Sequence, residues 1–409
     1  MSFSSLYIDE RLVNQLGTLG FESPTPIQSA AIPHILDGKD VMAGAQTGTG
    51  KTAAFGLPIL HKLLQTPSEH KKARALILVP TRELAQQVKQ SLVSYAPEEM
   101  KIEAVYGGVS LKPQMDSLRA GVDMIIATPG RLIDLHSKRA VDLRQVEQLV
   151  FDEADRMLDM GFKDEIRQVL RFIPKERQTL LFSATFDDSL FTFCKRILTN
   201  PELIEVDSRN SAAAKVTQTL YVIDSDRKAQ FTSYLIGSKN WQQVLIFTKT
   251  KQGADALAKE MEKDGLPTQS IHGDKSQGAR DRALEAFKVG DIRALVATDV
   301  AARGLDIGGL DYVINFDLPY IAEDYVHRIG RCGRAGREGL AISLMSLGEE
   351  YLLEEVEAVI KDRIPQQWYP GFEPDLTKEI TDNRKNSRGA QKRRAKKRGQ
   401  GGRSGNRRR

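Results

Sequence analysis

Short apolar runs alternate with longer amphipathic stretches along the first half of the chain. We expect strands at residues 41–43, 75–79, 102–106, 124–127, 148–151, 179–182 and 203–206. Several of these runs are hydrophobic without interruption, which is typical of parallel strands covered on both faces. Helical periodicity at 82–95 and 163–172 separates them. The pattern therefore predicts a doubly wound α/β domain over residues 1–206.

The polar segment 207–216 has no strand pattern, and we interpret it as a linker. A second alternating series follows, with strands expected at 218–223, 244–247, 268–271, 294–297, 312–316 and 341–345. An amphipathic helix is expected at 349–362, with its apolar residues on one face. The second series predicts another parallel-sheet α/β domain, over residues 217–362.

Composition places these domains in a globular protein. The chain has 409 residues, of which 41% are hydrophobic, so two or three packed domains are expected. No apolar run approaches the roughly 18 residues that a membrane span needs, and residues 1–5 lack a signal-peptide core. The two cysteines, Cys194 and Cys332, are far apart in sequence and suggest no disulfide framework. A reducing, cytoplasmic location is the expectation.

Positive charge is concentrated at the C-terminus. Residues 383–409 contain 13 Lys or Arg and no Asp or Glu, which leaves 59 − 13 = 46 basic against 54 acidic residues in the remainder. We expect residues 363–409 to form a largely disordered basic tail that binds nucleic acid. A solubilising end is the alternative, although a remainder with a net charge of −8 has little need of one.

A glycine-rich octapeptide follows the first apolar run and precedes a helical pattern. It comprises Ala45, Gln46, Thr47, Gly48, Thr49, Gly50, Lys51 and Thr52. Strand, glycine-rich loop and helix in this order are the context of a phosphate-binding loop. We expect Lys51 to reach the outer phosphates of a nucleotide and Thr52 to hold Mg2+. Ala45 departs from the general pattern, which begins with glycine.

Four residues, Asp152, Glu153, Ala154 and Asp155, follow the apolar run at 148–151. Carboxylates at the C-terminal end of a parallel strand lie where α/β sheets bind ligands. Asp152 fits a Mg2+ ligand, mostly through water, and Glu153 fits orientation of an attacking water. An ordinary acidic helix start is the alternative reading of these residues, which the phosphate-binding loop disfavours.

Together these segments resemble the DEAD-box RNA helicases over residues 1–362. The matching segments are 20–21 with 24–28, 45–52, 80–85, 107–108, 128–131, 152–155, 183–185, 244–250, 277 with 280, 297–306 and 327–334. Cys332 stands where the family usually has threonine. The resemblance implies two tandem RecA-like domains, ATP and Mg2+ as ligands, and RNA as partner; the basic tail suggests a bacterial, RhlE-like member.

For the nucleotide base, the resemblance implies that Thr25 and Gln28 belong to an adenine-reading segment. The planar amide of Gln28 offers one donor and one acceptor side, which suits adenine and favours ATP over GTP. An aromatic ring would stack on the base, and Phe21 and Phe3 are the candidates. The resemblance points to Phe3 as the upstream aromatic, and simple packing is the alternative for Phe21.

The second domain should supply the charge that the phosphate-binding loop lacks. Arg331 and Arg334 are three residues apart, so on a helical turn both face one ligand as arginine fingers. A phosphate-backbone contact is the alternative. By resemblance, Asp306 contacts the ribose at the closed interface and His327 bridges toward the first domain. Hydrolysis would be coupled to strand separation through Asp155, Ser183 and Thr185.

RNA contacts are implied for nine residues that suit backbone recognition. They are Thr81, Arg82, Gly107, Gly108, Thr128, Arg131, Arg280, Thr298 and Asp299. Contacts to phosphates and 2′-hydroxyls carry no base sequence, so binding should be largely sequence-independent. We expect local, non-processive opening of short duplexes in ribosome assembly or RNA decay. A DNA-translocating ATPase and a non-catalytic annealing protein are the rival interpretations.

Overall fold

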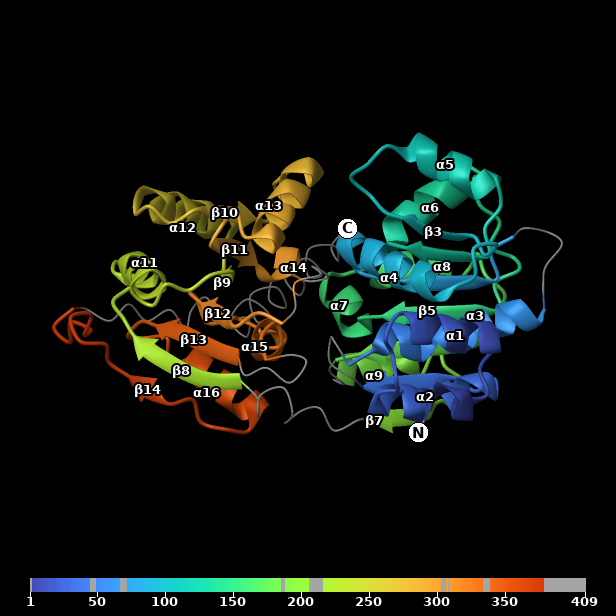
Figure 1. Cartoon of the computed structure of the whole chain (residues 1–409), viewed down its shortest axis with the longest axis horizontal. Helices are drawn as coiled ribbons and strands as arrows, with labels where there is room; N and C mark the ends of the chain where they lie inside the picture. Colours follow the sequence, from blue (N-terminus) through green and yellow to red (C-terminus); the bar gives the residue numbers. More distant parts are fainter. Residues whose placement is uncertain are drawn as a thin grey trace, which may run out of the picture. The chain divides into compact units, whose positions relative to one another are not determined.

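The computed structural model describes residues 2–44, 49–66, 72–184, 188–205, 216–302, 307, 309–333 and 339–378. These residues form two compact units, one before and one after the segment 206–215. Each unit is a seven-stranded parallel sheet with helices on both faces (Figure 1). The predicted fold class is confirmed, and every predicted strand is present to within two residues at either end.

The first sheet has the strand order β3-β4-β2-β5-β6-β1-β7. Its strands are β1 (Val41–Gly44), β2 (Ala75–Leu78), β3 (Ile102–Val105), β4 (Met124–Ala127), β5 (Gln148–Asp152), β6 (Gln178–Ser183) and β7 (Glu202–Glu205). Its helices are η1 (Phe3–Leu6), α1 (Glu10–Thr18), α2 (Pro26–Leu36), α3 (Lys51–Gln65), α4 (Arg82–Tyr95), α5 (Leu111–Arg119), α6 (Pro129–Ser137), α7 (Ala154–Asp159), α8 (Lys163–Val169) and α9 (Asp188–Cys194).

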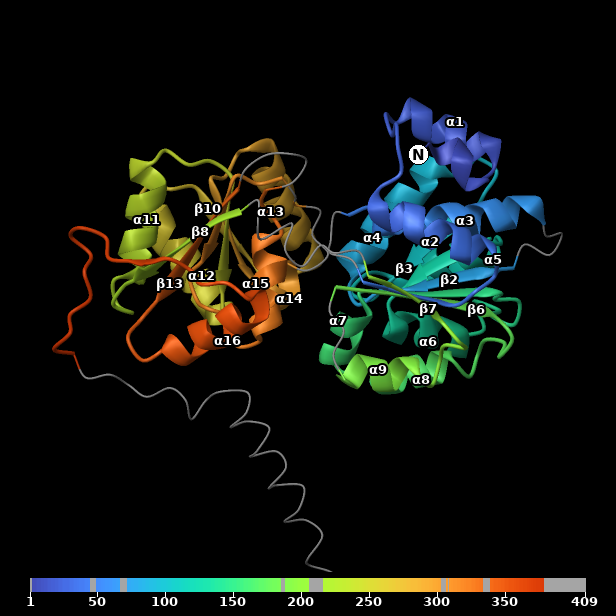
Figure 2. The same ribbon diagram turned by 90° about the horizontal axis from the view of Figure 1, so that it is seen from below.

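Two hydrophobic layers sandwich this sheet. One layer packs α1 to α4 against it, and the other packs α6 to α9 against the opposite face (Figure 2). The central strands are buried along their whole length, which explains why their sequences are apolar at consecutive positions. All carboxyl ends of parallel strands lie at one edge, so the loops that follow them share that edge.

The second sheet repeats the arrangement, with the strand order β10-β11-β9-β12-β13-β8-β14. Its strands are β8 (Val216–Val222), β9 (Val244–Thr248), β10 (Thr268–Ile271), β11 (Ala294–Thr298), β12 (Tyr312–Asn315), β13 (Gly339–Met345) and β14 (Gln366–Gln367). Its helices are α11 (Lys228–Ser238), α12 (Lys251–Lys263), α13 (Gln277–Val289), α14 (Asp299–Ala302), α15 (Ala322–Ile329) and α16 (Glu350–Ile360). Position for position, β9 corresponds to β2 and β14 to β7.

The second unit extends beyond the predicted boundary at residue 362. Residues 363–378, here called the C-terminal strap, include β14, which pairs in parallel with β8. Ile364 in the strap is 3% exposed. The prediction that disorder begins at residue 363 is therefore wrong for the strap, while residues 379–409 lie outside the described part of the chain. The sequence pattern missed β14 because the two glutamines and several prolines of the strap are not typical of a strand.

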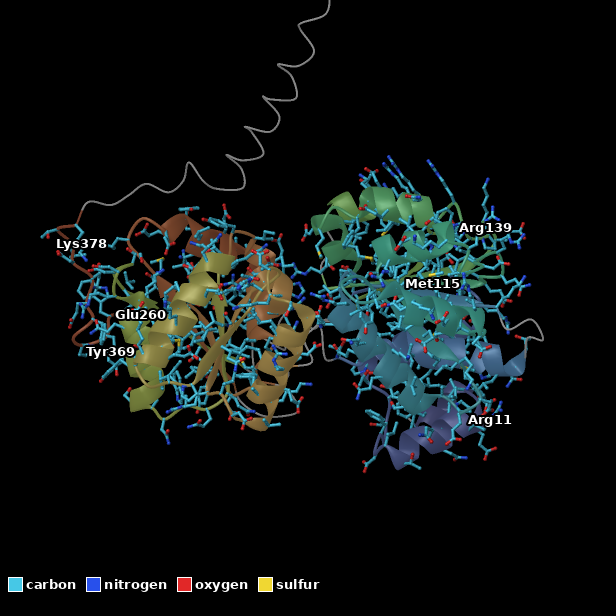
Figure 3. All side chains as sticks on the ribbon, turned by 90° about the horizontal axis from the view of Figure 1, so that it is seen from above. Arg11, Met115, Arg139, Glu260, Tyr369 and Lys378 are labelled. Carbon is cyan, nitrogen blue, oxygen red and sulfur yellow. The ribbon has the colours of Figure 1, made fainter. Side chains whose placement is uncertain are left out.

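Aromatic rings attach the strap to α11. The rings of Tyr369 and Phe372 approach Phe231 at centroid distances of 5.2 and 5.1 Å. The guanidinium of Arg227 lies 4.8 Å from the centre of the Phe372 ring and donates to the Gly371 carbonyl at 2.5 Å. Tyr369 and Lys378 both lie along one edge of the second unit (Figure 3). The strap thus covers part of the apolar core formed by α11 and α12.

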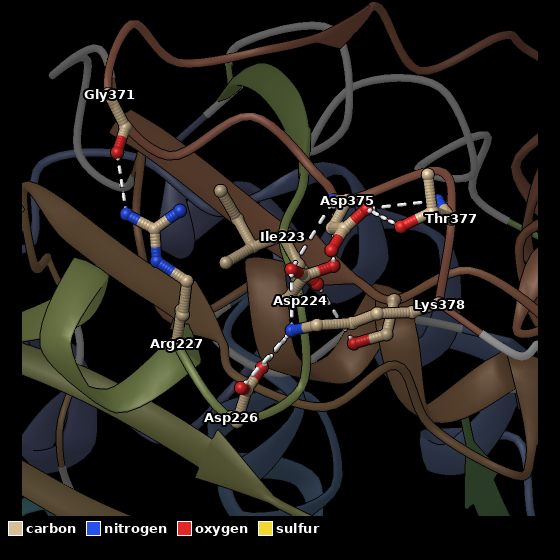
Figure 4. A network of polar contacts seen from close by, with 9 residues as sticks. Ile223, Asp224, Asp226, Arg227, Gly371, Asp375, Thr377 and Lys378 are labelled. Atoms are coloured by element: carbon tan, nitrogen blue, oxygen red, sulfur yellow. Dashed lines mark hydrogen bonds and ion pairs between the residues drawn. The ribbon is translucent and has the colours of Figure 1, made fainter.

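A polar network holds the end of the strap (Figure 4). The Asp375 backbone N–H donates to Asp224 at 3.2 Å. The Lys378 Nζ donates to Asp224 at 2.9 Å and to Asp226 at 3.0 Å. Because Asp224 is only 7% exposed, its carboxylate needs these partners. The network fixes the point from which the chain continues into the basic segment.

Candidate functional site

Three neighbouring strands of the first sheet bring the predicted catalytic segments together. The order β5-β6-β1 places the end of β6 between the other two. Gly44 is in register with Ser183, and Phe182 is in register with Asp152. The start of the phosphate-binding loop, Ser183 and the acidic segment therefore share one edge of the sheet. Asp155 follows at the first turn of α7.

The phosphate-binding loop joins β1 to α3, as the sequence predicts. Ala45, Gln46, Thr47 and Gly48 lie outside the described residues, whereas Thr49 and Gly50 precede the helix that begins at Lys51. Gly50 has φ +90°, and a Cβ added there would lie 2.3 Å from Gln28 Nε2. Only glycine suits both the backbone angle and this close approach. The turn into α3 thus depends on Gly50.

Three buried polar atoms at this edge have no hydrogen-bond partner within the described part of the chain. They are Lys51 Nζ, Asp152 Oδ1 and Glu153 Oε2. Buried polar atoms are normally paired, so this set indicates a ligand with complementary groups. A triphosphate supplies acceptors for Lys51, and a hydrated Mg2+ suits a single carboxylate. The donor set fits Mg2+-ATP, with Asp152 and Thr52 able to hold the metal.

Burial alters the acid–base behaviour of Asp152. The carboxyl group is 3% exposed, and desolvation raises its pKa to about 6. The neighbouring Lys51 charge lowers the pKa, whereas the Glu153 charge raises it further. Among the described residues, no cluster of three or more His, Cys, Asp or Glu side chains is available to hold a metal. Mg2+ usually binds through one or two carboxylates, substrate phosphates and water, so the single carboxylate of Asp152 suits it.

Glu153 occupies an unusual backbone conformation. Its φ of +55° and ψ of +51° are left-handed, at the junction between β5 and α7. Such angles cost a non-glycine residue of order 1–3 kcal/mol and are concentrated at functional sites. Here the turn keeps the 7%-exposed Glu153 side chain beside Asp152. The role of Glu153 in orienting water stays a prediction.

The adenine-reading segment contacts the loop. Gln28 Nε2 donates to the Gly50 carbonyl at 3.1 Å, and Gln28 Oε1 accepts from the Thr25 N–H at 2.9 Å. Each amide side retains capacity for one more hydrogen bond. Phe21 is 47% exposed and its ring lies edge-to-face with Tyr95 at 6.2 Å, whereas Phe3 is 4% exposed within the core. Both rings stay candidates for stacking on the base.

The RNA-contact candidates of the first unit follow three adjacent strands, β3, β4 and β2. Thr81 begins α4, and the Arg82 guanidinium lies beside Gly108, where an added Cβ would be 2.4 Å from Nη1. Thr128 begins α6. Arg131 donates to the Val109 carbonyl at 2.9 Å, which ties the β3 and β4 loops together. A Cβ added at Gly107 would lie in open space. The structure places all six predicted residues at one edge.

In the second unit, Thr298 ends β11 and Arg280 is buried in α13. Asp299 accepts two hydrogen bonds from Arg328, at 2.6 and 2.8 Å. Both carboxylate oxygens therefore accept from Arg328, and each can still accept a further hydrogen bond, so the RNA contact of Asp299 stays a prediction. Arg328 is 1% exposed, and the sequence pattern assigned it no role of its own.

Arg331 lies just after α15, and its backbone N–H donates to the Arg328 carbonyl at 3.1 Å. Its side chain is 6% exposed. Cys332 donates from Sγ to the Ile329 carbonyl at 3.1 Å, a bond that a threonine hydroxyl makes equally well. His327 is in the last turn of α15. Arg334, Asp306 and Thr185, which were also predicted, lie outside the described residues.

Two family descriptions match the chain. Residues 25–193 match the DEAD/DEAH box helicase family, and residues 227–336 match the helicase conserved C-terminal domain. The chain is 43% identical to the ATP-dependent RNA helicase CshA of Listeria monocytogenes over 88% of this chain and 69% of the relative. It is 40% identical to the ATP-dependent RNA helicase RhlB of Pseudomonas syringae over 88% of this chain and 93% of the relative.

Solved structures agree with these matches. S. cerevisiae Dbp5 bound to RNA and ADP BeF3 has a TM-score of 0.80 and 30% identity over 90% of this chain and 95% of that chain. Mss116p bound to ssRNA and AMP-PNP has a TM-score of 0.82 and 28% identity over 93% and 83%. Separately, none of the helices in the described residues combines the length and apolar character needed to cross a membrane.

Proposed function

This chain belongs to the DEAD-box family of ATP-dependent RNA helicases, and from that premise we propose how its residues perform the reaction. The observation that carries the proposal is the set of unpartnered buried atoms on Lys51, Asp152 and Glu153. They lie at the carboxyl edge of a parallel sheet, beside a glycine that permits close approach.

In the first unit, Lys51 binds the outer phosphates, while Thr52 and Asp152 hold Mg2+ mostly through water. When bound, Mg2+ would supply positive charge that offsets the charge of the phosphate oxygens. Glu153 orients the attacking water and accepts its proton, for which its position next to Asp152 is suitable. Gln28 and Thr25 read the adenine, with Phe3 or Phe21 stacked on the base.

In the second unit, Arg331 and Arg334 stabilise charge that develops on the transferred phosphoryl group. Arginine fingers contribute on the order of 10³–10⁵ in rate in other nucleotidases. Asp306 contacts the ribose, and His327 bridges toward the first unit. Hydrolysis therefore requires closure of the two units on ATP, and Asp155, Ser183 and Thr185 couple that closure to the RNA.

RNA binds through its backbone to the nine residues predicted above. Base stacking is worth about 1.4 kcal/mol per step in DNA duplexes, so one closure opens only a handful of steps. We infer local, non-processive separation of short duplexes, followed by release after hydrolysis.

Rates of ATP hydrolysis and duplex separation test this function directly. We expect RNA, and not DNA of the same sequence, to stimulate ATP hydrolysis, and we expect a duplex of about 10 base pairs to open far faster than one of about 40. Equal stimulation by DNA would favour a DNA-translocating ATPase. Strand annealing without ATP turnover would favour a non-catalytic RNA-binding protein.

The cellular role is proposed from the family. A cytoplasmic, RhlE-like enzyme acting on pre-ribosomal particles or with RNA-decay proteins fits a chain with a basic C-terminal segment. Crosslinking the protein to RNA in cells and sequencing the attached RNA tests this assignment. Enrichment of ribosomal RNA precursors supports a role in assembly, and a uniform distribution over messenger RNA contradicts it.

A further inference from the structure

A buried ion triad lies at the carboxyl edge of the second sheet. Glu349 accepts from Lys249 Nζ at 2.7 Å and from Lys228 Nζ at 3.0 Å. It also accepts from the Ser346 backbone N–H at 3.0 Å. The side chains of Lys228, Lys249 and Glu349 are 4%, 13% and 12% exposed. Burial acts against the Glu349 charge, yet the two lysines lower its pKa to about 2.

The triad joins three segments that are far apart in sequence. Lys228 begins α11, Lys249 lies in the loop between β9 and α12, and Glu349 immediately precedes α16. The loop is fixed from its other side by Asp317, whose carboxylate accepts from the Lys249 backbone N–H at 2.8 Å. The Asp317 carbonyl in turn accepts from Arg328 at 2.6 Å. The β9–α12 loop is thus held at both its backbone and its side chain.

Comparison of the two sheets indicates a role for the β9–α12 loop. Strand β9 occupies the place in its sheet that β2 occupies in the other. Thr250 begins α12 with φ −130° and ψ 154°, and Thr81 begins α4 with φ −130° and ψ 156°. Both hydroxyls accept from the backbone N–H three residues later. Lys251 therefore takes the place of Arg82, a predicted phosphate contact.

Stability alone does not explain a charged triad at this place. A buried ion pair is seldom more stabilising than apolar residues of the same size, because desolvation of the charges offsets their attraction. The triad instead fixes the relative positions of three chain segments, because two cations donate short, oriented hydrogen bonds to one carboxylate. An apolar cluster would leave the β9–α12 loop free to shift.

We propose that Lys228, Glu349 and Lys249 are positioning residues that hold the β9–α12 loop so that Thr250 and Lys251 meet an RNA strand. The inference rests on the proposed function and adds a group outside the RNA-contacting residues themselves. It requires that loss of the triad weaken RNA binding and leave the ATP-binding residues of the first unit unaffected.

The test is RNA-stimulated ATP hydrolysis by full-length Glu349→Gln, with a single-stranded oligoribonucleotide as the probe. We expect the RNA concentration for half-maximal stimulation to rise about tenfold or more, because one hydrogen bond between a charged group and a phosphate contributes about that factor to binding. The rate at saturating RNA and the KM for ATP should stay within about twofold. Glu355→Gln, on the exposed face of α16, is the matched control and should match wild type.

A double-mutant cycle with Lys251→Gln separates positioning from general destabilisation. If the triad acts through the loop, the effects of Glu349→Gln and Lys251→Gln on RNA affinity are less than additive. Should Glu349→Gln fold poorly, the pair Lys228→Met with Glu349→Gln removes the remaining repulsion and serves instead. An unchanged RNA requirement, or full additivity, overturns the inference. Absence of RNA stimulation in the wild type overturns the proposed function itself.

Discussion

Truncation of the chain at two points distinguishes the strap from the segment that follows it. A chain ending at Lys378 keeps every strap contact described above, whereas a chain ending at Asp362 loses β14, Ile364 and the rings of Tyr369 and Phe372. Burying one such side chain fully contributes about 1.5–3 kcal/mol. One buried isoleucine and two partly buried rings therefore give about 4–6 kcal/mol.

This loss is large beside the roughly 5–15 kcal/mol by which a domain is usually stable. With a urea dependence of about 2 kcal/mol per molar, the unfolding midpoint of the second unit should fall by about 2–3 M. Only Trp241 and Trp368 are present, both in the second unit, and Trp241 is 8% exposed. Trp241 fluorescence in both truncated chains therefore reports unfolding of that unit.

The chain ending at Lys378 should unfold at the wild-type midpoint. It should bind RNA more weakly, with a flatter salt dependence, because it lacks the 13 Lys or Arg of residues 383–409. The reasoning is refuted if the chain ending at Asp362 unfolds at the same urea concentration as the chain ending at Lys378.

Further predictions concern the first unit. Glu153→Gln should abolish ATP turnover while ATP and RNA still bind; turnover at the wild-type rate would exclude the assigned role. Burial raises the pKa of Asp152 to about 6, so the carboxylate is ionised above pH 6 and protonated below it. Affinity for a Mg2+-nucleotide should therefore fall about tenfold per pH unit below pH 6. The same titration of Asp152→Asn should lack this pH-dependent loss of affinity. Gly50→Ala should weaken ATP binding at least tenfold, because its Cβ meets Gln28 at 2.3 Å; fluorescent-nucleotide titration measures this, and unchanged affinity would show that the close approach is dispensable.

The sequence pattern predicted strands well because burial on both faces makes them apolar throughout. It failed at β14, whose two glutamines pair with β8 through the backbone alone. The glycine-rich and acidic segments could be singled out in the sequence because each needs particular residue types at fixed spacing. Strand order then explains why they share one edge.

Contacts between side chains that are far apart in the sequence were harder to predict from local sequence patterns. Phe3 and Phe21 were both predicted as stacking rings, and their different burial could not be read from the sequence. The pairing of Asp299 with Arg328, 29 residues later in the chain, was not predicted. Glu349 meets Lys228 across 121 residues, a pairing that no local pattern encodes.

The central claim is that both units supply chemistry to one hydrolytic reaction. Measurement of RNA-stimulated ATP hydrolysis by Arg331→Ala, beside binding of a fluorescent ATP analogue to the same variant, tests it most directly. The account predicts a fall in turnover of about 10³-fold or more with nucleotide affinity nearly unchanged. Turnover close to wild type would show that the first unit works without this arginine and would contradict the account.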